Sequence, residues 1–111
     1  MQPLELFLEV VRSSKELPAD VRLHVDEASG VGETCFDESY IAFLDEQIQL
    51  SPRGPEWAEI LKRRREILLP FCNITLVSGQ IRSGGFIHLI KIDPKTKTIV
   101  NWEQAEYSDQ P

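Results

Sequence analysis

The sequence predicts an α+β fold: helix, strand, helix and helix, followed by a three-stranded antiparallel meander, giving a three- to four-stranded sheet packed on helices. Residues 3–16 and 55–69 carry apolar side chains at helical spacing, and residues 72–104 are rich in β-branched and aromatic side chains. The 111 residues, 41% hydrophobic and 27% charged, have the composition of a folded globular chain. We expect one domain over residues 1–104 and a flexible tail over 105–111.

The first expected helix covers residues 3–16. Pro3 suits a first helical turn, and apolar side chains follow at helical spacing, at Leu4, Phe7, Leu8 and Val11. Leu17-Pro18 ends this helix, because the residue before a proline avoids the α region. The next segment, "DVRLHVDE", alternates apolar and polar residues and is expected to form a half-buried strand.

Two further helices are expected after a glycine-containing loop at residues 28–34. Asp37 is a candidate N-cap for a helix that begins at Glu38, with Tyr40, Phe43 and Leu44 on one side. The later half of residues 38–50 is open between helix and strand, because "QIQL" alternates. The other helix begins near Pro55 and stops at Pro70.

The last third predicts three antiparallel strands, "CNITLVSGQIR", "GGFIHLIKI" and "TIVNWEQ". The segments "RSGG" and "DPKT" supply the two turns between them. The middle strand has apolar side chains on both faces, so we expect it at the centre of the sheet.

The N-terminal segment and the cysteines bear on the compartment. "MQPLELFLEVVRSSKEL" lacks the features of a signal peptide, and no apolar run approaches the ~20 residues that span a bilayer. We therefore expect a cytoplasmic protein that does not enter a membrane. Cys35 and Cys72 form neither a CxxC pair nor a disulfide framework, and we expect two buried or half-buried thiols.

The net charge of −6 is unevenly distributed along the chain. Residues 1–50 hold 3 basic and 11 acidic side chains, residues 51–97 hold 9 and 4, and the remainder holds 3 acidic ones. This asymmetry either neutralises itself when the two halves fold together, or marks surfaces for charged partners.

No residue pattern predicts catalysis or a cofactor. His24 and His88 are the only imidazoles, and nothing in the spacing joins either one to a cysteine nucleophile or a metal site. We expect His88 to be a hydrogen-bonded residue of the sheet. The expectation is therefore a protein that is not an enzyme and has no cofactor or bound metal.

The acidic first half favours a protein-binding or regulatory module, of the inhibitor, immunity-protein or adaptor kind, that docks on a partner with a basic surface. A second copy of the chain is a further possible partner. The expected contacts are carboxylates with exposed aromatic anchors: Asp26, Glu27, Asp37, Glu38, Tyr40, Asp45, Glu46 and Trp102.

The basic run "KRRR" suggests an alternative. The order of helices followed by a hairpin resembles, in topology alone, a winged helix-turn-helix module, with residues 55–69 as recognition helix and the 82–85 hairpin as wing. This resemblance implies nucleic-acid binding, and its contacts would be Lys62, Arg63, Arg65 and Arg82.

Arg64 has a separate role in this helix. At about 100° per residue, it falls in the middle of the apolar stripe formed by Ile60, Leu61 and Leu68. Its guanidinium must reach water, pair with a carboxylate such as Asp26, Asp37 or Asp45, or bind an anion. A small enzyme or ligand binder with an anion pocket at Arg64 is the third hypothesis.

Overall fold

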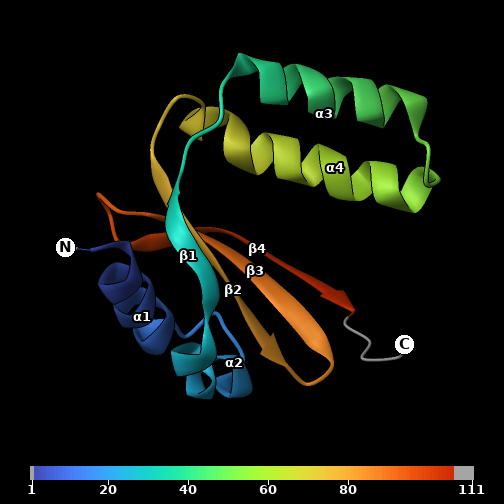
Figure 1. The fold of residues 1–111 in the computed structure, drawn as a ribbon. Coiled ribbons are helices and arrows are strands. Elements are labelled where there is room, and N and C mark those ends of the chain that lie inside the picture. The colour runs from blue at the N-terminus through green and yellow to red at the C-terminus, as the bar shows by residue number, and fades with distance from the viewer. Residues whose placement is uncertain (1, 107–111) are drawn as a thin grey trace. The chain divides into compact units, whose positions relative to one another are not determined.

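The computed structural model describes residues 2–106, which belong to two compact units. Among the described residues, the sheet unit comprises 2–34 and 76–106, and the helical unit comprises 35–75. Helices and an antiparallel sheet are both present, so the predicted α+β class is confirmed (Figure 1). The expectation of one domain over residues 1–104 stays a prediction. Within the described residues, no helix is both long enough and apolar enough to cross a membrane.

The sheet has four antiparallel strands in the order β1-β2-β3-β4. They are β1 (Ser29–Thr34), β2 (Leu76–Ser83), β3 (Phe86–Asp93) and β4 (Thr98–Glu106). Strands β2 to β4 form the predicted meander. Gly84 and Gly85, both at positive φ, make the predicted β2–β3 turn.

Strand β4 continues to Glu106, so Ala105 and Glu106 belong to the sheet and not to the expected tail. The rest of that tail, residues 107–111, lies outside the described residues.

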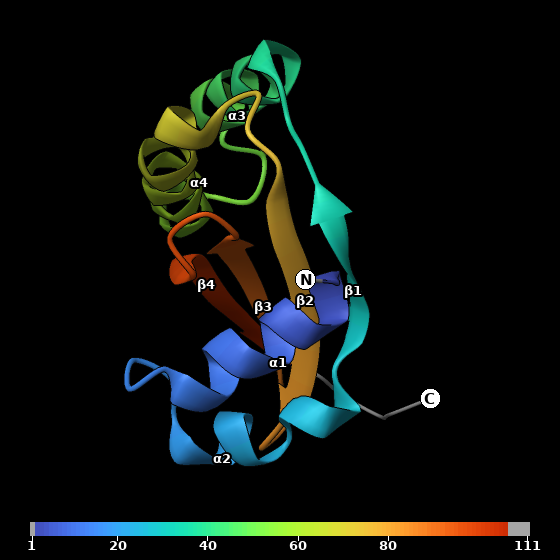
Figure 2. The ribbon, with the colours of Figure 1, turned by 90° about the vertical axis from the view of Figure 1, so that its left-hand side faces the viewer.

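Helix α1 (Pro3–Ser13) covers one face of the sheet, as Figures 1 and 2 show. Its apolar side packs with side chains of β2 and β3 in the main core, which contains Leu6, Phe7, Val10, Val11, Leu17, Val21, Val25, Val77, Ile81, Ile90 and Ile92. Gly79 permits the close approach of α1, because a Cβ atom at this position would lie 2.8 Å from atoms of both Phe7 and Val31. The face of Gly79 is thus the covered face, and Ser78 and Gln80 belong to the other one.

The strand expected over "DVRLHVDE" is wrong, since this segment forms helix α2 (Ala19–Leu23) and the 3-10 turn η1 (Val25–Glu27). Val21 and Val25 are buried, which both a strand and a helix would allow. Leu23 distinguishes the two, because a strand would bury it beside them, whereas it is 78% exposed. The i, i+4 spacing of the two valines is therefore a helical one.

The loop expected at residues 28–34 is also wrong, since this segment contains β1. Its pairing with β2 shifts register between Ser29 and Gly32, and Gly30 within that bulge has φ 62°. Val31 packs against the core, so pairing and packing outweigh the weak strand preference of the two glycines.

The helical unit is a pair of helices lying side by side, α3 (Glu38–Leu50) and α4 (Pro55–Leu68), followed by the 3-10 turn η2 (Leu69–Phe71) (Figure 1). Asp37 caps α3 as predicted, with its carboxylate accepting from the Ser39 amide at 2.9 Å. The ambiguous half of residues 38–50 is helical throughout. Ser51 and Gly54, both at positive φ, turn the chain into α4.

Candidate functional site

Three aromatic rings follow one another from Phe36, just before the Asp37 cap, into the first turns of α3. The Phe36 and Tyr40 ring centroids are 5.5 Å apart and meet edge to face, and the Tyr40 and Phe43 centroids are 6.3 Å apart and stacked. Leu50 continues the same line at helical spacing. We call Phe36, Tyr40, Phe43 and Leu50 the α3 ridge.

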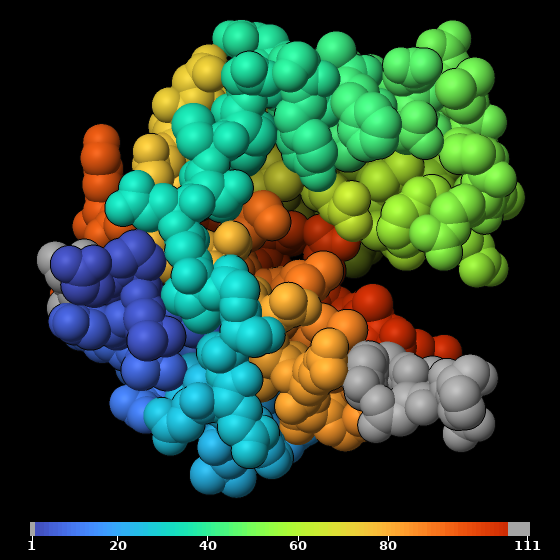
Figure 3. Space-filling view, in the orientation of Figure 1, coloured from blue at the N-terminus to red at the C-terminus, as the bar shows by residue number. Residues whose placement is uncertain are grey.

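The outer part of the ridge is open to solvent. Phe43 is 52% exposed and Leu50 is 65% exposed. With Tyr40 as origin, these two side chains point near about 300° and 280°, whereas the buried Ile41 and Leu44 point near about 100° and 40°. Helix α3 forms part of the molecular surface in Figure 3. Phe43 was expected to share a side with Leu44, but a step of about 100° takes it out of the buried face.

Glu46 is the carboxylate beside the ridge, exposed and near about 240° on the same wheel. Glu38 and Asp45, near about 160° and 140°, belong to the opposite flank. The Glu38 carboxylate accepts from Asn73 Nδ2 at 3.1 Å, and the Asp45 carboxylate accepts from Arg65. These two acids are thus occupied within the helical unit.

Asp37 has a structural role at the start of α3. The Ser39 hydroxyl and then the Ser39 backbone amide donate to its carboxylate and lower the pKa of Asp37 below its ordinary value. Of the eight residues expected to contact a partner, five therefore lie on α3 or its cap, and Tyr40 and Glu46 lie along the ridge or beside it.

The other three expected contacts belong to the sheet unit. Asp26 pairs with Arg12, and Glu27 is exposed on the same 3-10 turn. Trp102, expected as an exposed anchor, packs against the core instead. Its indole Nε1 donates to Nδ1 of the buried His88 at 3.1 Å. The prediction that His88 is a hydrogen-bonded sheet residue is confirmed.

The four basic residues of the nucleic-acid alternative lie in different surroundings. Lys62 pairs with Glu59 at 3.1 Å, and Arg65 Nε donates to Asp45 Oδ1 at 2.5 Å. Arg63 is exposed on α4, while Arg82 is exposed on β2 in the other unit. The four residues of the nucleic-acid alternative are therefore not one free basic patch within the described chain, because two of them already have carboxylate partners.

Arg64 lies at the border of the buried face and not at its middle. With Trp57 as origin, the buried Ala58, Leu61 and Leu68 span about 20° to 100°, with Arg64 near about 340° and Arg65 near about 80°. The predicted centre of the buried face fell at Arg64 because Ile60 was counted as buried, whereas it is 44% exposed. Arg65 is the arginine on the packed side, and Asp45 neutralises it.

Two guanidinium groups lie near the Trp57 ring. The Arg53 and Arg64 Cζ atoms are 4.3 Å and 5.7 Å from the ring centroid. Such contacts stabilise a cation by roughly 0.5–1 kcal/mol at exposed sites. Trp57 thus supports the position of Arg64, and Asp26 and Asp45, two of the carboxylates considered for it, pair with Arg12 and Arg65.

The cysteines differ from expectation in part. Cys35 is exposed, contrary to the expected burial, and Cys72 is half-buried as expected. Burial raises the pKa of the Cys72 thiol, with smaller contributions from Glu38, Asp37 and Cys35. Among the residues described, no group of three or more His, Cys, Asp or Glu side chains could hold a metal ion.

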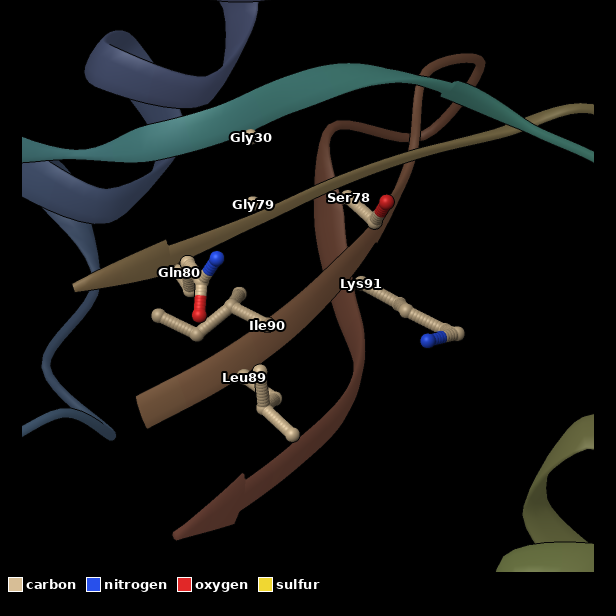
Figure 4. A pocket seen from close by; sticks show the side chains of 7 residues that line it. All are labelled: Gly30, Ser78, Gly79, Gln80, Leu89, Ile90 and Lys91. Atoms are coloured by element: carbon tan, nitrogen blue, oxygen red, sulfur yellow. The ribbon is translucent and has the colours of Figure 1, made fainter. Parts of the chain in front are cut away.

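A depression of about 170 Å³ lies where β1, β2 and β3 adjoin, lined by Gly30, Ser78, Gly79, Gln80, Leu89, Ile90 and Lys91 (Figure 4). Ser78 lies opposite Lys91 and Gln80 opposite Leu89 in the strand register, on the face away from α1. Sites for small organic ligands usually enclose roughly 300–1,000 Å³. The depression is too small for such a ligand, and the α3 ridge is the stronger candidate.

No family model, curated protein or solved structure matches the chain. The chemistry of the ridge is therefore the basis for a functional assignment. Two phenyl rings, a phenol and a leucine beside a carboxylate offer apolar area and one negative charge, which is suited to binding a protein.

Proposed function

We propose that the protein is a protein-binding regulatory module, not an enzyme, and that the α3 ridge contacts a partner whose apolar groove has a basic rim. The observation that carries this proposal is the exposure of Phe43 and Leu50 in line with Tyr40. An amphipathic helix that inserts aromatic and leucine side chains into a groove is a recurrent mode of recognition. We place this activity in the cytoplasm.

Charge supports the same partner. Glu46 is exposed beside the ridge, and residues 35–75 hold 7 acidic and 5 basic side chains, a net charge of −2. A basic rim on the partner would accelerate association and favour one orientation, while the ridge supplies most of the affinity.

The test is affinity capture from native cell extract with three forms of the full chain. The Phe43→Ser/Leu50→Ser variant removes the exposed part of the ridge. The Leu4→Ser/Leu23→Ser variant is the matched control, because it removes two side chains of similar exposure, 50% and 78%, from the sheet unit. We expect a protein that the wild type and the control retain and that the ridge variant loses.

Binding kinetics with the purified partner then isolate the contribution of charge to the association rate. Glu46→Lys should slow association, and raising the salt from about 50 to about 500 mM should slow the wild type more than Glu46→Lys. Retention of the same proteins by the ridge variant would refute the proposal. Loss of the captured material on nuclease treatment would instead favour the nucleic-acid alternative.

A further inference from the structure

Strand β4 forms an edge of the sheet. Among the described residues it has one neighbouring strand, β3, and its other side faces no strand. An unpaired edge is a template for pairing with another chain. The opposite edge, β1, is a poorer template, because after the bulge between Ser29 and Gly32 only residues 32–34 pair in continuous register.

The regular part of β4 is its second half. The register with β3 shifts between Lys91, which lies opposite Asn101, and Ile92, which lies opposite Ile99. Val100 is the extra residue of this bulge, and "NWEQAE" from Asn101 onwards pairs without interruption. This stretch contains neither lysine nor proline, and its charged side chains, which can limit pairing at an edge, are Glu103 and Glu106.

From this edge we infer that a second copy of the chain pairs antiparallel with residues 102–106 of β4, around a two-fold axis at Gln104. Directly opposite residues in an antiparallel pair carry their side chains on the same face of the sheet, so a two-fold axis between two copies of one strand must pass midway between the two copies of a single residue. The axes at Glu103, Trp102 and Gln104 can therefore be compared.

An axis at Glu103 would place the two Glu103 carboxylates opposite each other, which is destabilising. An axis at Trp102 would pair only residues 101–103 before the bulge. The axis at Gln104 pairs five described residues of each copy. It sets Glu103 opposite Ala105, and Glu106 opposite Trp102, so no two acidic residues are directly opposed. The charge pattern favours this register.

The register makes an unusual charge prediction, which sedimentation of the full chain at about 1 to 500 μM can test. Gln104 lies opposite Gln104 of the second copy, so a charge of either sign at this position is opposed by the same charge. Gln104→Glu and Gln104→Lys should therefore both raise the dissociation constant of the dimer. Ala105 faces Glu103, so Ala105→Lys should lower that constant and Ala105→Glu should raise it. Each opposed pair changes it by a factor of about 1.5 to 5.

Two controls separate this edge from other causes. Lys95→Glu changes the charge in the β3–β4 turn and should leave the dimer unchanged. Phe43→Ser/Leu50→Ser should also dimerise normally, so failure of the edge and failure of the α3 ridge are distinguishable. A wild-type chain that stays monomeric over the whole range overturns the inference. So do opposite effects of the two Gln104 variants, or equal effects of the two Ala105 variants.

Discussion

The guanidinium of Arg65 on α4 is paired with the carboxylate of Asp45 on α3, with 2.5 Å between Nε and Oδ1. Their side chains are 34% and 52% exposed, so the pair is only partly withdrawn from water. The pair joins the two helices of the helical unit and neutralises the arginine nearest the centre of the packed face of α4.

Asp45→Asn should lower the free energy of unfolding by about 0.5–1 kcal/mol, because it leaves the half-buried Arg65 without its carboxylate. Glu59→Gln is the matched control, since it breaks the more exposed Lys62–Glu59 pair within one helix and should cost no more than about 0.5 kcal/mol. Urea unfolding monitored by tryptophan fluorescence, to which Trp57 and Trp102 both contribute, measures both. An equal effect of the two substitutions would contradict this ranking.

Gly79→Ala should destabilise the sheet unit by about 1–3 kcal/mol, because the new Cβ overlaps the Phe7 ring and Val31 at 2.8 Å. Gly32→Ala on the neighbouring strand has no atom within 4 Å of its new Cβ and should have a much smaller effect. Thermal unfolding compares the two. Adding Phe7→Leu to Gly79→Ala should recover part of the loss; a further loss would show that Phe7 is not the obstacle.

Val21→Ala should cost about 1–3 kcal/mol of stability, whereas Leu23→Ala should stay within about 0.5 kcal/mol. Val21 is fully buried on α2 and Leu23 is mostly exposed. In a strand the two side chains would share a face and give similar losses, so denaturant titration of this pair distinguishes the two structures of the segment.

Ser83→Ala should raise the pKa of Asp20 toward its ordinary value. The Ser83 hydroxyl donates to Asp20 Oδ2 at 2.7 Å and is the main cause of the lowered pKa. A carboxyl whose pKa is lower in the folded state stabilises the fold above its unfolded pKa of about 3.9, and this contribution disappears as the pH falls through the folded pKa.

Two measurements check this pH dependence. NMR titration of the Asp20 carboxyl gives the pKa, and Ser39→Ala, which acts on Asp37, is the control. Wild type should exceed Ser83→Ala in stability at pH 7, and the difference should shrink on acidification. A difference that does not change with pH would indicate lost packing and not lost charge.

Much of the fold could be predicted from local signals. The Pro55 and Pro70 boundaries, the Asp37 cap and the two hairpin turns each specify a backbone conformation within a few residues. Segments that depend on distant residues could not be predicted in this way. Residues 29–34 form a strand because they pair with residues 76–80. The burial of Val21 and Val25 is compatible with a strand or a helix, and only the exposure of Leu23 distinguishes the two.

The candidate site was predicted in part. The carboxylates and Tyr40 pointed to α3, but the exposed Phe43 and Leu50 were missed, because hydrophobicity alone does not tell which apolar side chains a helix buries. A helical wheel over all of residues 38–50 contains a usable signal. Ile41, Leu44 and Ile48 form one arc, and Phe43 and Leu50 fall outside it. On α4, the exposed Ile60 was likewise counted as buried, and this placed Arg64, instead of Arg65, at the centre of the buried face.

The pairing of Thr34 with Leu76 has a consequence for how this chain could change. Residues 35–75 leave the end of β1 and return to the start of its antiparallel neighbour β2, so they occupy the position of a hairpin loop. Lengthening or shortening such a loop changes its closure entropy only slowly, by about 0.6 kcal/mol per doubling. Replacing the helix pair by a segment of another length should therefore leave the register of the sheet unchanged.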